Sequence, residues 1–370
     1  MYPLYALLFA DTGLSGTQIS VLFMIWSVTG FVAEVPTGAL ADRFSRRAAL
    51  VAAGVLQAAG YVLWVLAPGF PGFAAGFVIW SVGGALASGS FEALLYDGMV
   101  AAGAEAAYPA VYGRSEALEL LAQLPAAGAA TVLFSLGHYQ LVAWASVASC
   151  LISAALAARL PEPPRQHGDD GGPAGYLATL RAGVAEAAGS PPVRAAVIAV
   201  AVLSGVDALE EYFPLLAADW GVPERVVPVA TVGIPLAGAA GAALGGVAGR
   251  LRPAALGAVL GAGAVLFAGT GLLRLPAGLL GVAVFYGLYR MVVVVTDARL
   301  QQRITGPARA TVTSAAALAT EVTALLVFGV WAVGGIMPVA ALILLTAVGL
   351  PRLLRVPDRR TAPRSPDRPR

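Results

Sequence analysis

The sequence contains no lysine, so all 23 of its basic residues are arginine. This absence removes a phosphate-binding loop of the GxxxxGK type, which makes ATP hydrolysis by the chain unexpected, and it removes lysine Schiff-base chemistry. Two histidines, His138 and His167, and a single cysteine, Cys150, are too few for a metal site or an internal disulfide. We therefore expect no cofactor and no metal, and no catalytic residues point to an enzyme.

Charge of either sign is also scarce. Charged residues make up 12% of the 370 residues, about half the share of a typical soluble domain, while 58% are hydrophobic. A soluble core cannot bury that much apolar sequence, whereas a lipid bilayer can. The net charge of +2 gives no indication of a nucleic-acid partner. The composition predicts an all-α, multi-pass protein of the cell membrane.

A helix needs about 20 apolar residues to cross the hydrocarbon core of a bilayer. Residues 1–10 form about half such a span. We interpret them as the outer half of a first helix that is truncated in this sequence; the alternative is a short re-entrant or interfacial segment. The eleven full spans that we predict are residues 19–40, 48–66, 73–96, 118–136, 140–156, 195–218, 226–247, 254–273, 277–296, 310–333 and 337–354.

One long polar insertion, residues 159–194, divides the spans into six and six. It separates an N-terminal six-helix bundle, residues 1–158, from a C-terminal one, residues 195–355. Residues 356–370 form an arginine-rich tail that we expect to be disordered. Within the linker, apolar residues at helical spacing predict a short amphipathic helix on the membrane surface: Tyr176, Leu177, Leu180 and Val184.

The arginines predict the orientation of the chain. If the loop that follows the span 19–40 is cytoplasmic, strict alternation places 20 of the 23 arginines on that side of the membrane. Arg225 and Arg274 fall outside, and Arg290 falls within a span. Because cytoplasmic loops carry the excess of basic residues, we expect the linker and the C-terminal tail to be cytoplasmic.

Residues 38–47, Gly-Ala-Leu-Ala-Asp-Arg-Phe-Ser-Arg-Arg, resemble the signature loop of the major facilitator superfamily, G-x-L-A-D-R-x-G-R-R. Their place between the second and third spans also agrees, although Ser45 replaces the usual glycine. The resemblance implies twelve helices in two six-helix bundles, here with the first helix truncated. It further implies a secondary transporter, taken to be a monomer, that works by alternating access. Residues 34–38 and 88–97 resemble a multidrug-like bacterial branch.

The same resemblance implies a gate of charged residues at the cytoplasmic face. Asp42 is expected to lie against the N-terminus of the eleventh span near Arg309, and Arg43 is expected to reach Asp97. The proposed gate motif comprises Gly38, Asp42, Arg43, Arg46, Arg47, Asp97 and Arg309. The alternative is that these arginines merely follow the positive-inside rule.

The seventh span carries three carboxylates, Asp207, Glu210 and Glu211. Helical spacings of three and four predict that they lie on nearly one face, where they cannot all stay charged in a low dielectric. We interpret them as a proton or cation site; the alternative is that Glu210 and Glu211 lie in water near the outer mouth. Arg290, one turn after Tyr286, could pair with them or hold an anionic substrate.

Glu34 and Glu92 lie in the inner thirds of the second and fourth spans. Ionisable residues inside a membrane often mark a pathway, so both are candidates, with structural hydrogen bonding as the alternative. Glu321 in the eleventh span is similar. We expect Trp26, Trp80 and the other aromatic residues to be packing or interfacial anchors. Tyr286 and Tyr289, beside Arg290, are the exceptions, and Tyr286 is a candidate pathway residue.

The leading functional hypothesis is a proton-coupled efflux carrier, an antiporter, for lipophilic and cationic small molecules. Its alternative is a proton-coupled uptake or metabolite carrier of the same fold for a small solute, such as an anionic one. The expected partners are therefore a small-molecule substrate, protons and the lipid bilayer. An Arg290 that faces the carboxylates would favour coupling, and an unpaired Arg290 would favour anion binding.

Overall fold

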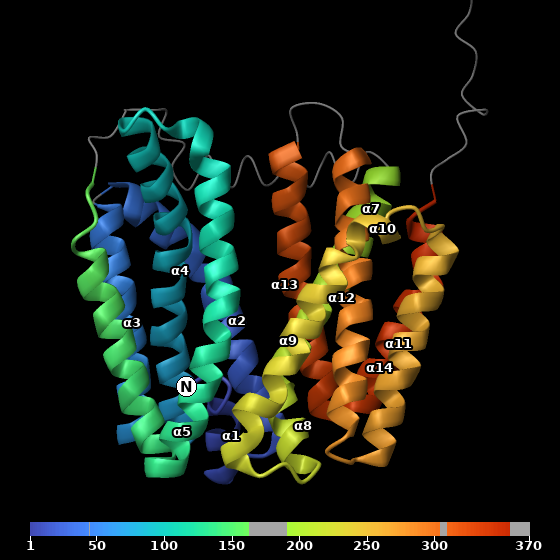
Figure 1. Cartoon of the computed structure of the whole chain (residues 1–370), viewed down its shortest axis with the longest axis horizontal. Helices are drawn as coiled ribbons and strands as arrows, with labels where there is room; N and C mark the ends of the chain where they lie inside the picture. The colour runs from blue at the N-terminus through green and yellow to red at the C-terminus, as the bar shows by residue number, and fades with distance from the viewer. Residues whose placement is uncertain (44, 163–190, 304–308, 356–370) are drawn as a thin grey trace, which may run out of the picture.

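A computed structural model of the chain describes residues 1–43, 45–162, 191–303 and 309–355 (Figure 1). Every regular element in these ranges is a helix, as the sequence predicts. The side chains of Asp42, Arg43 and Arg309 lie outside what the structure describes, although their backbones belong to helices. The predicted linker helix and C-terminal tail fall in residues 163–190 and 356–370, which are also outside the described residues.

The helices form two groups along the chain. The N-terminal group comprises α1 (Tyr5–Asp11), α2 (Gly16–Arg43), α3 (Arg46–Leu66), α4 (Phe70–Ala101), η1 (Glu105–Ala107) and α5 (Tyr108–Ala157). The C-terminal group comprises α7 (Pro191–Gly205), η2 (Val206–Tyr212), α8 (Phe213–Asp219), η3 (Glu224–Val226), α9 (Val227–Ala243), α10 (Gly245–Ala248), α11 (Pro253–Leu273), α12 (Gly278–Arg303), α13 (Arg309–Gly334) and α14 (Ile336–Leu353).

Ten stretches of the described chain are long and apolar enough to cross a membrane. One of them contains α5, whose 50 residues would extend about 75 Å as a straight helix, more than twice the hydrocarbon thickness. The backbone leaves helical geometry at Gly137 and at His138, where φ is 49°, and the chain turns back there (Figure 1). Helix α5 therefore contains both the fifth and the sixth predicted spans. Helix α1, with seven residues, occupies the place of the predicted half-span.

Much of the apolar surface faces outward. Between 22% and 56% of the residues in each candidate span are buried inside the protein. Large side chains such as Val333 and Leu272 are 87% and 75% exposed. Apolar patches on this scale cannot face water, so the outer surface is a lipid-facing one. The chain is an integral membrane protein.

The two helix groups form two bundles that lie side by side (Figure 1). They meet where α2 contacts α13, α5 contacts α9 and α1 contacts α8. Among the described residues, the side-chain hydrogen bonds that cross between the bundles come from Tyr5, Thr17, Ser20 and Ser27, all in α1 or the first half of α2. The bundles are thus joined at the end that holds α1 and α8, which we call the closed end. They diverge toward the linker end (Figure 1).

Small residues allow the closest helix contacts inside the C-terminal bundle. A Cβ at Gly241 of α9 would lie 1.9 Å from the carbonyl oxygen of Gly287 in α12. A Cβ at Gly257 of α11 would lie 2.6 Å from the carbonyl oxygen of Ala347 in α14. In membranes such small-residue seams supply packing that the hydrophobic effect cannot, because lipid tails are as apolar as leucine.

Candidate transport site

The seventh span is interrupted in its middle. Helix α7 ends at Gly205, the chain winds as a 3-10 helix through η2, and α8 begins at Phe213. Pro214 has no N–H to donate to the carbonyl of Glu210, which removes one α-helical hydrogen bond at this point. A 3-10 helix has three residues per turn, so residues three apart lie on one face and consecutive residues point about 120° apart.

Asp207 and Glu210 are three apart and face α12. The Tyr286 hydroxyl donates a hydrogen bond to Asp207 Oδ1 at 2.9 Å and another to Glu210. The Arg290 guanidinium forms an ion pair with Asp207. Both side chains of this pair are about one-third exposed. We call these four residues, Asp207, Glu210, Tyr286 and Arg290, the carboxylate cluster.

The prediction that all three carboxylates share one face is wrong for Glu211. In an α-helix Glu211 would lie about 40° from Asp207, whereas the 3-10 winding turns it about 120° away. The Glu211 carboxylate instead accepts a hydrogen bond from the Tyr5 hydroxyl of α1, in the other bundle. The winding of η2 therefore separates Glu211 from the carboxylate cluster.

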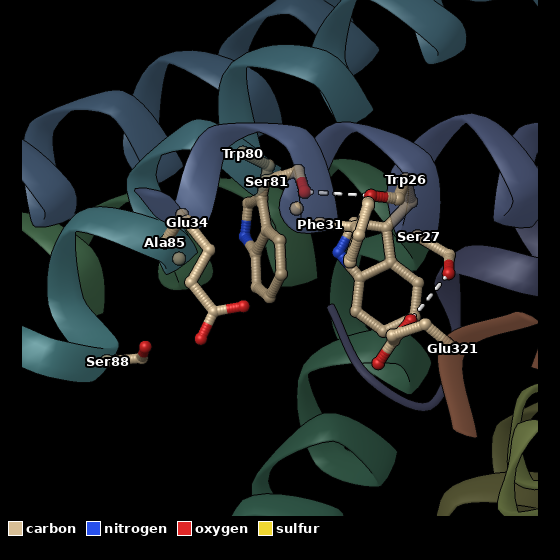
Figure 2. A pocket seen from close by; sticks show the side chains of 11 residues that line it. Trp26, Ser27, Phe31, Glu34, Trp80, Ser81, Ala85, Ser88 and Glu321 are labelled. Carbon is tan, nitrogen blue, oxygen red and sulfur yellow. Dashed lines mark hydrogen bonds between the residues drawn. The ribbon is translucent and has the colours of Figure 1, made fainter. Parts of the chain in front are cut away.

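A pocket of about 260 Å³ lies between α2, α4 and α13. Figure 2 shows the rings of Trp26 and Trp80 standing between the carboxylates of Glu34 and Glu321. The two ring centroids are 6.2 Å apart. We call this the central pocket; its lining residues are Trp26, Ser27, Gly30, Phe31, Glu34, Trp80, Ser81, Gly84, Ala85, Ser88 and Glu321.

Two hydrogen bonds hold the walls of the central pocket. Ser81 donates to the carbonyl oxygen of Trp26 at 2.8 Å, which ties α4 to α2. Ser27 donates to Glu321 Oε2 at 2.9 Å, which ties α2 to α13 across the two bundles (Figure 2). Glu321 also lines a second pocket, of about 280 Å³, between α7, α12 and α13. The central pocket is therefore built from both halves of the molecule.

The sequence model of one family, the Major Facilitator Superfamily, matches residues 1–337. The chain belongs to the Major Facilitator Superfamily. Because this is a family of transporters, the chain is a transporter and not an enzyme. No curated protein matches the chain.

Solved structures of transporters of this superfamily have the same fold. The chain is similar to nucleoside transporter NupG, with a TM-score of 0.71 and 12% identity over 94% of this chain and 91% of that one. It is also similar to a D-xylose-proton symporter, with a TM-score of 0.67 and 16% identity over 92% of this chain and 89% of that one. A third similar structure is a bacterial homologue of the human lysosomal transporter Spinster, in an inward-facing and occupied conformation. Its TM-score is 0.66, with 16% identity over 95% of this chain and 88% of that one. At these sequence identities the similarity shows a shared fold and nothing about the substrate.

The superfamily signature loop lies at the linker end of the N-terminal bundle. Asp97 of α4 forms an ion pair with Arg46 of α3, whereas Arg43 was the partner expected from the sequence. This ion pair joins two helices of the same bundle. The expected contacts of Gly38, Asp42, Arg43 and Arg309 involve positions whose side chains lie outside the described part of the structure.

Glu162, just after the N-terminal bundle, was not singled out in the sequence. It accepts hydrogen bonds from Ser45 Oγ at 2.6 Å and from the backbone N–H of Arg46 at 2.9 Å, at the N-terminus of α3. Arg47 Nε lies 3.9 Å from Glu162 Oε2. Partial burial by itself would raise the pKa of Glu162, but these hydrogen bonds and the Arg47 charge hold the pKa below its ordinary value. A carboxylate at this helix end also meets the favourable end of the helix dipole.

The depressed pKa predicts a pH-dependent anchor. The stability from charged Glu162 is fully present above its ordinary pKa of 4.5 and is lost as the pH falls through the lowered folded value. We expect Glu162→Gln to lower the melting temperature at pH 7. In strong acid, where Glu162 is itself protonated, the melting temperatures of the variant and the unmodified protein should converge. Melting curves at several pH values measure this, with the exposed Glu105→Gln as control. Equal shifts for both variants would contradict the anchor.

Glu92 is brought to a different place from the other candidate pathway residues. It accepts a hydrogen bond from Tyr112 of α5 at 2.9 Å and is not among the residues that line the central pocket. This contact favours the structural alternative for Glu92. Glu34, by contrast, opens into the pocket.

Sequence reasoning missed the role of the two pocket tryptophans and of Tyr5. Trp26, Gly30 and Glu34 are spaced by four on α2, and Trp80, Gly84 and Ser88 are spaced by four on α4. Such a stripe of small and polar residues along an apolar span indicates the face that turns away from lipid. The Tyr5–Glu211 contact left no such signal, because its partners are 206 residues apart.

Proposed function

We propose that the chain is a proton-coupled antiporter that exports lipophilic cationic small molecules by alternating access. The observation that carries this is the central pocket, where two carboxylates flank two indole rings and none of the described lining residues is basic. Carboxylates supply charge attraction, and an indole face attracts a cation by about 0.5–2 kcal/mol. An ammonium ion with apolar substituents, or another lipophilic cation, fits this chemistry better than an anion or a sugar does.

The carboxylate cluster supports proton coupling. Arg290 faces the carboxylates and is paired with Asp207, which favours coupling over capture of an anionic substrate. A proton on Asp207 would cancel the charge that holds Arg290, so protonation and rearrangement of this ion pair are linked. The cluster lies on α12 and η2, apart from the central pocket on α2, α4 and α13. Proton and substrate would therefore act on different helices of one carrier.

The geometry also supports alternating access. The bundles are joined at the closed end and diverge at the linker end (Figure 1). With the linker and the C-terminus on the cytoplasmic side, as the arginine distribution indicates, this arrangement is an inward-facing carrier. A monomer is sufficient, because both bundles that build the central pocket come from one chain.

Uptake of a small solute is the second candidate. Arg290 keeps about one-third of its side chain exposed, so an anionic group could reach it beside Asp207. This reading would require proton and solute to move in the same direction.

Proton flux in proteoliposomes tests the two candidates directly. A pH dye would be trapped inside the vesicles, and lipophilic cationic dyes and drugs would be added outside. Alkalinisation of the lumen that depends on the cation means antiport and supports the proposal. Acidification means symport and favours uptake. No pH response to any cation, from protein shown to be folded, would contradict cation antiport.

The pocket tryptophans give a graded prediction. Trp80→Phe should weaken binding of a cationic dye less than Trp80→Leu does, because phenylalanine keeps a π face and leucine has none. From the range of cation–π energies, we expect Trp80→Leu to lower affinity about 2- to 30-fold. Dye binding measured by fluorescence polarisation tests this.

The control for this series is the charge of the ligand. A neutral dye of similar size should show no difference between Trp80→Phe and Trp80→Leu beyond the loss of apolar contact. If both dyes lost the same affinity, Trp80 would be a packing residue and not part of a cation site.

A further inference from the structure

The 3-10 segment η2 presents three different faces to three neighbours. Asp207 and Glu210 face α12 through Tyr286 and Arg290. Glu211 faces α1 through Tyr5. The third face carries the residues Val206, Leu209 and Tyr212, all of them buried. Because residues of a 3-10 helix repeat every three positions, this threefold division follows from the winding of the segment.

Tyr212 inserts between the two bundles. Its ring stacks on Trp331 of α13, with centroids 4.1 Å apart and an interplanar angle of 16°. It contacts Phe23 of α2 edge-on at 5.4 Å, and its hydroxyl shares a 2.8 Å hydrogen bond with Ser20 of α2. With a fully buried ring, Tyr212 fills the joint between α2 and α13.

These contacts continue along α2 toward the central pocket. Thr17 donates to the carbonyl oxygen of Ala332, Ser20 bonds Tyr212, Phe23 meets Phe328 at 5.6 Å, and Ser27 donates to Glu321. The spacings of three and four place these α2 residues on one stripe. The stripe joins the closed end to the wall of the central pocket.

We propose that Tyr5 and Ser20 are positioning residues, which hold the closed end shut by binding Glu211 and Tyr212 and so couple this end to the carboxylate cluster on the same seven-residue segment. This proposal deepens the proposed transport function and rests on it for the role of the proton. A rearrangement of the Asp207–Arg290 pair moves η2. Because Glu211 and Tyr212 follow directly in the chain, that movement reaches both contacts with the opposite bundle.

Titratable and packed groups surround Glu211 and its segment η2 on several sides. Tyr5 donates a hydrogen bond to it from α1, and the ring of Tyr2 lies 6.1 Å from that of Tyr5. Asp207 and Glu210 belong to its own segment, and Arg290 and Tyr286 approach that segment from α12. At the start of η2, a Cβ at Gly205 would lie 2.5 Å from Cβ of Thr323 in α13. The segment is thus confined on the α12, α1 and α13 sides, so it cannot shift at one face without disturbing another.

The test measures the width of the closed end with spin labels. Leu136 and Leu275 are 74% and 54% exposed. Leu136 directly precedes the reversal of α5, Leu275 lies in the turn between α11 and α12, and both turns lie at the closed end (Figure 1). Labels at Leu136→Cys and Leu275→Cys, in a Cys150→Ser background, report the distance across it by pulsed electron paramagnetic resonance. The full chain would be reconstituted in lipid nanodiscs, without added substrate.

We expect Tyr5→Phe with Ser20→Ala to raise the ratio of open to closed populations about 30-fold, the effect of losing two hydrogen bonds of ordinary strength. The matched control is Tyr139→Phe. It also removes a tyrosine hydroxyl at the closed end, but that hydroxyl donates to Asp11 of the same bundle. We also expect Asp207→Asn to shift the distance distribution in the protein with Tyr5 and Ser20 intact. In the double variant the same substitution should have little further effect.

Two outcomes would overturn the proposal. One is a distance distribution in the double variant that equals that of Tyr139→Phe. The other is an equal shift on Asp207→Asn whether or not Tyr5 and Ser20 are present, which would mean that the contacts hold the end shut without coupling it. The readout needs neither substrate nor proton gradient. A positive distance result without cation-driven proton flux would therefore refute the proposed function alone, and the reverse would refute the coupling alone.

Discussion

Replacing Asp207 with asparagine is expected to reduce cation-driven proton flux to the level of protein-free vesicles. The amide cannot carry a proton on and off, and it leaves Arg290 without its anionic partner. Exchange of one cation for another across the membrane should persist, because that exchange needs the central pocket and no net proton movement. The measurement is the lumenal pH response in proteoliposomes, set beside radiolabelled substrate exchange in the same preparation.

Loss of flux could also come from misfolding, because an arginine stripped of its partner in a low dielectric is costly. The double variant Asp207→Asn with Arg290→Gln removes both charges and should recover the yield of folded protein while proton flux stays absent. Glu224→Gln, an exposed carboxyl at the closed end, should leave flux unchanged. A normal pH response from the single variant would rule Asp207 out as the coupling group.

The second large effect is expected from Gly241→Ala. The added Cβ would lie 1.9 Å from the carbonyl oxygen of Gly287, a backbone atom that no rotamer change can move away. On the other side of the contact, a Cβ at Gly287 would lie 2.9 Å from the carbonyl oxygen of Ala237, so α12 and α9 have no free space to slide into. Overpacking of this kind costs about 1–3 kcal/mol and sometimes more, and we expect the upper end.

Thermal unfolding of the purified protein and its yield in the membrane measure this cost. Gly233→Ala, in the same helix α9 but with no atom within 4 Å of the added Cβ, is the matched control and should leave stability unchanged or slightly improved. An unaltered melting temperature for Gly241→Ala would show that α9 and α12 are not held at this contact.

The span predictions succeeded where they depended on local chemistry. Stretches of about 20 apolar residues became helices because a membrane helix satisfies every backbone hydrogen bond within itself. The break predicted between the spans 118–136 and 140–156 is confirmed: the chain leaves helical geometry at Gly137 and His138 and reverses direction there. Membership of the Major Facilitator Superfamily was foreseen from the loop at residues 38–47 and is confirmed by the family match.

The site was only partly accessible to the same reasoning. The carboxylates of the seventh span could be found, since charged residues in an apolar run stand out. Their grouping could not be predicted, because nothing in the sequence distinguishes α-helical from 3-10 winding at this place, and the 3-10 segment before Pro214 turns Glu211 toward Tyr5. The pocket tryptophans were expected to be anchors, because an aromatic residue in an apolar span has the same local pattern whether it faces lipid or a cavity.

The sequence alone predicts which segments cross the membrane, which family the chain belongs to and which titratable residues lie within the spans. All three depend on the apolar or charged character of residues close together in the chain. The packing of the helices is what pairs Arg290 with Asp207, places Glu34 and Glu321 on either side of two indole rings, and brings Glu211 to the closed end. These contacts join helices that are distant in sequence, and their geometry depends on how each helix is wound, rotated and packed against its neighbours.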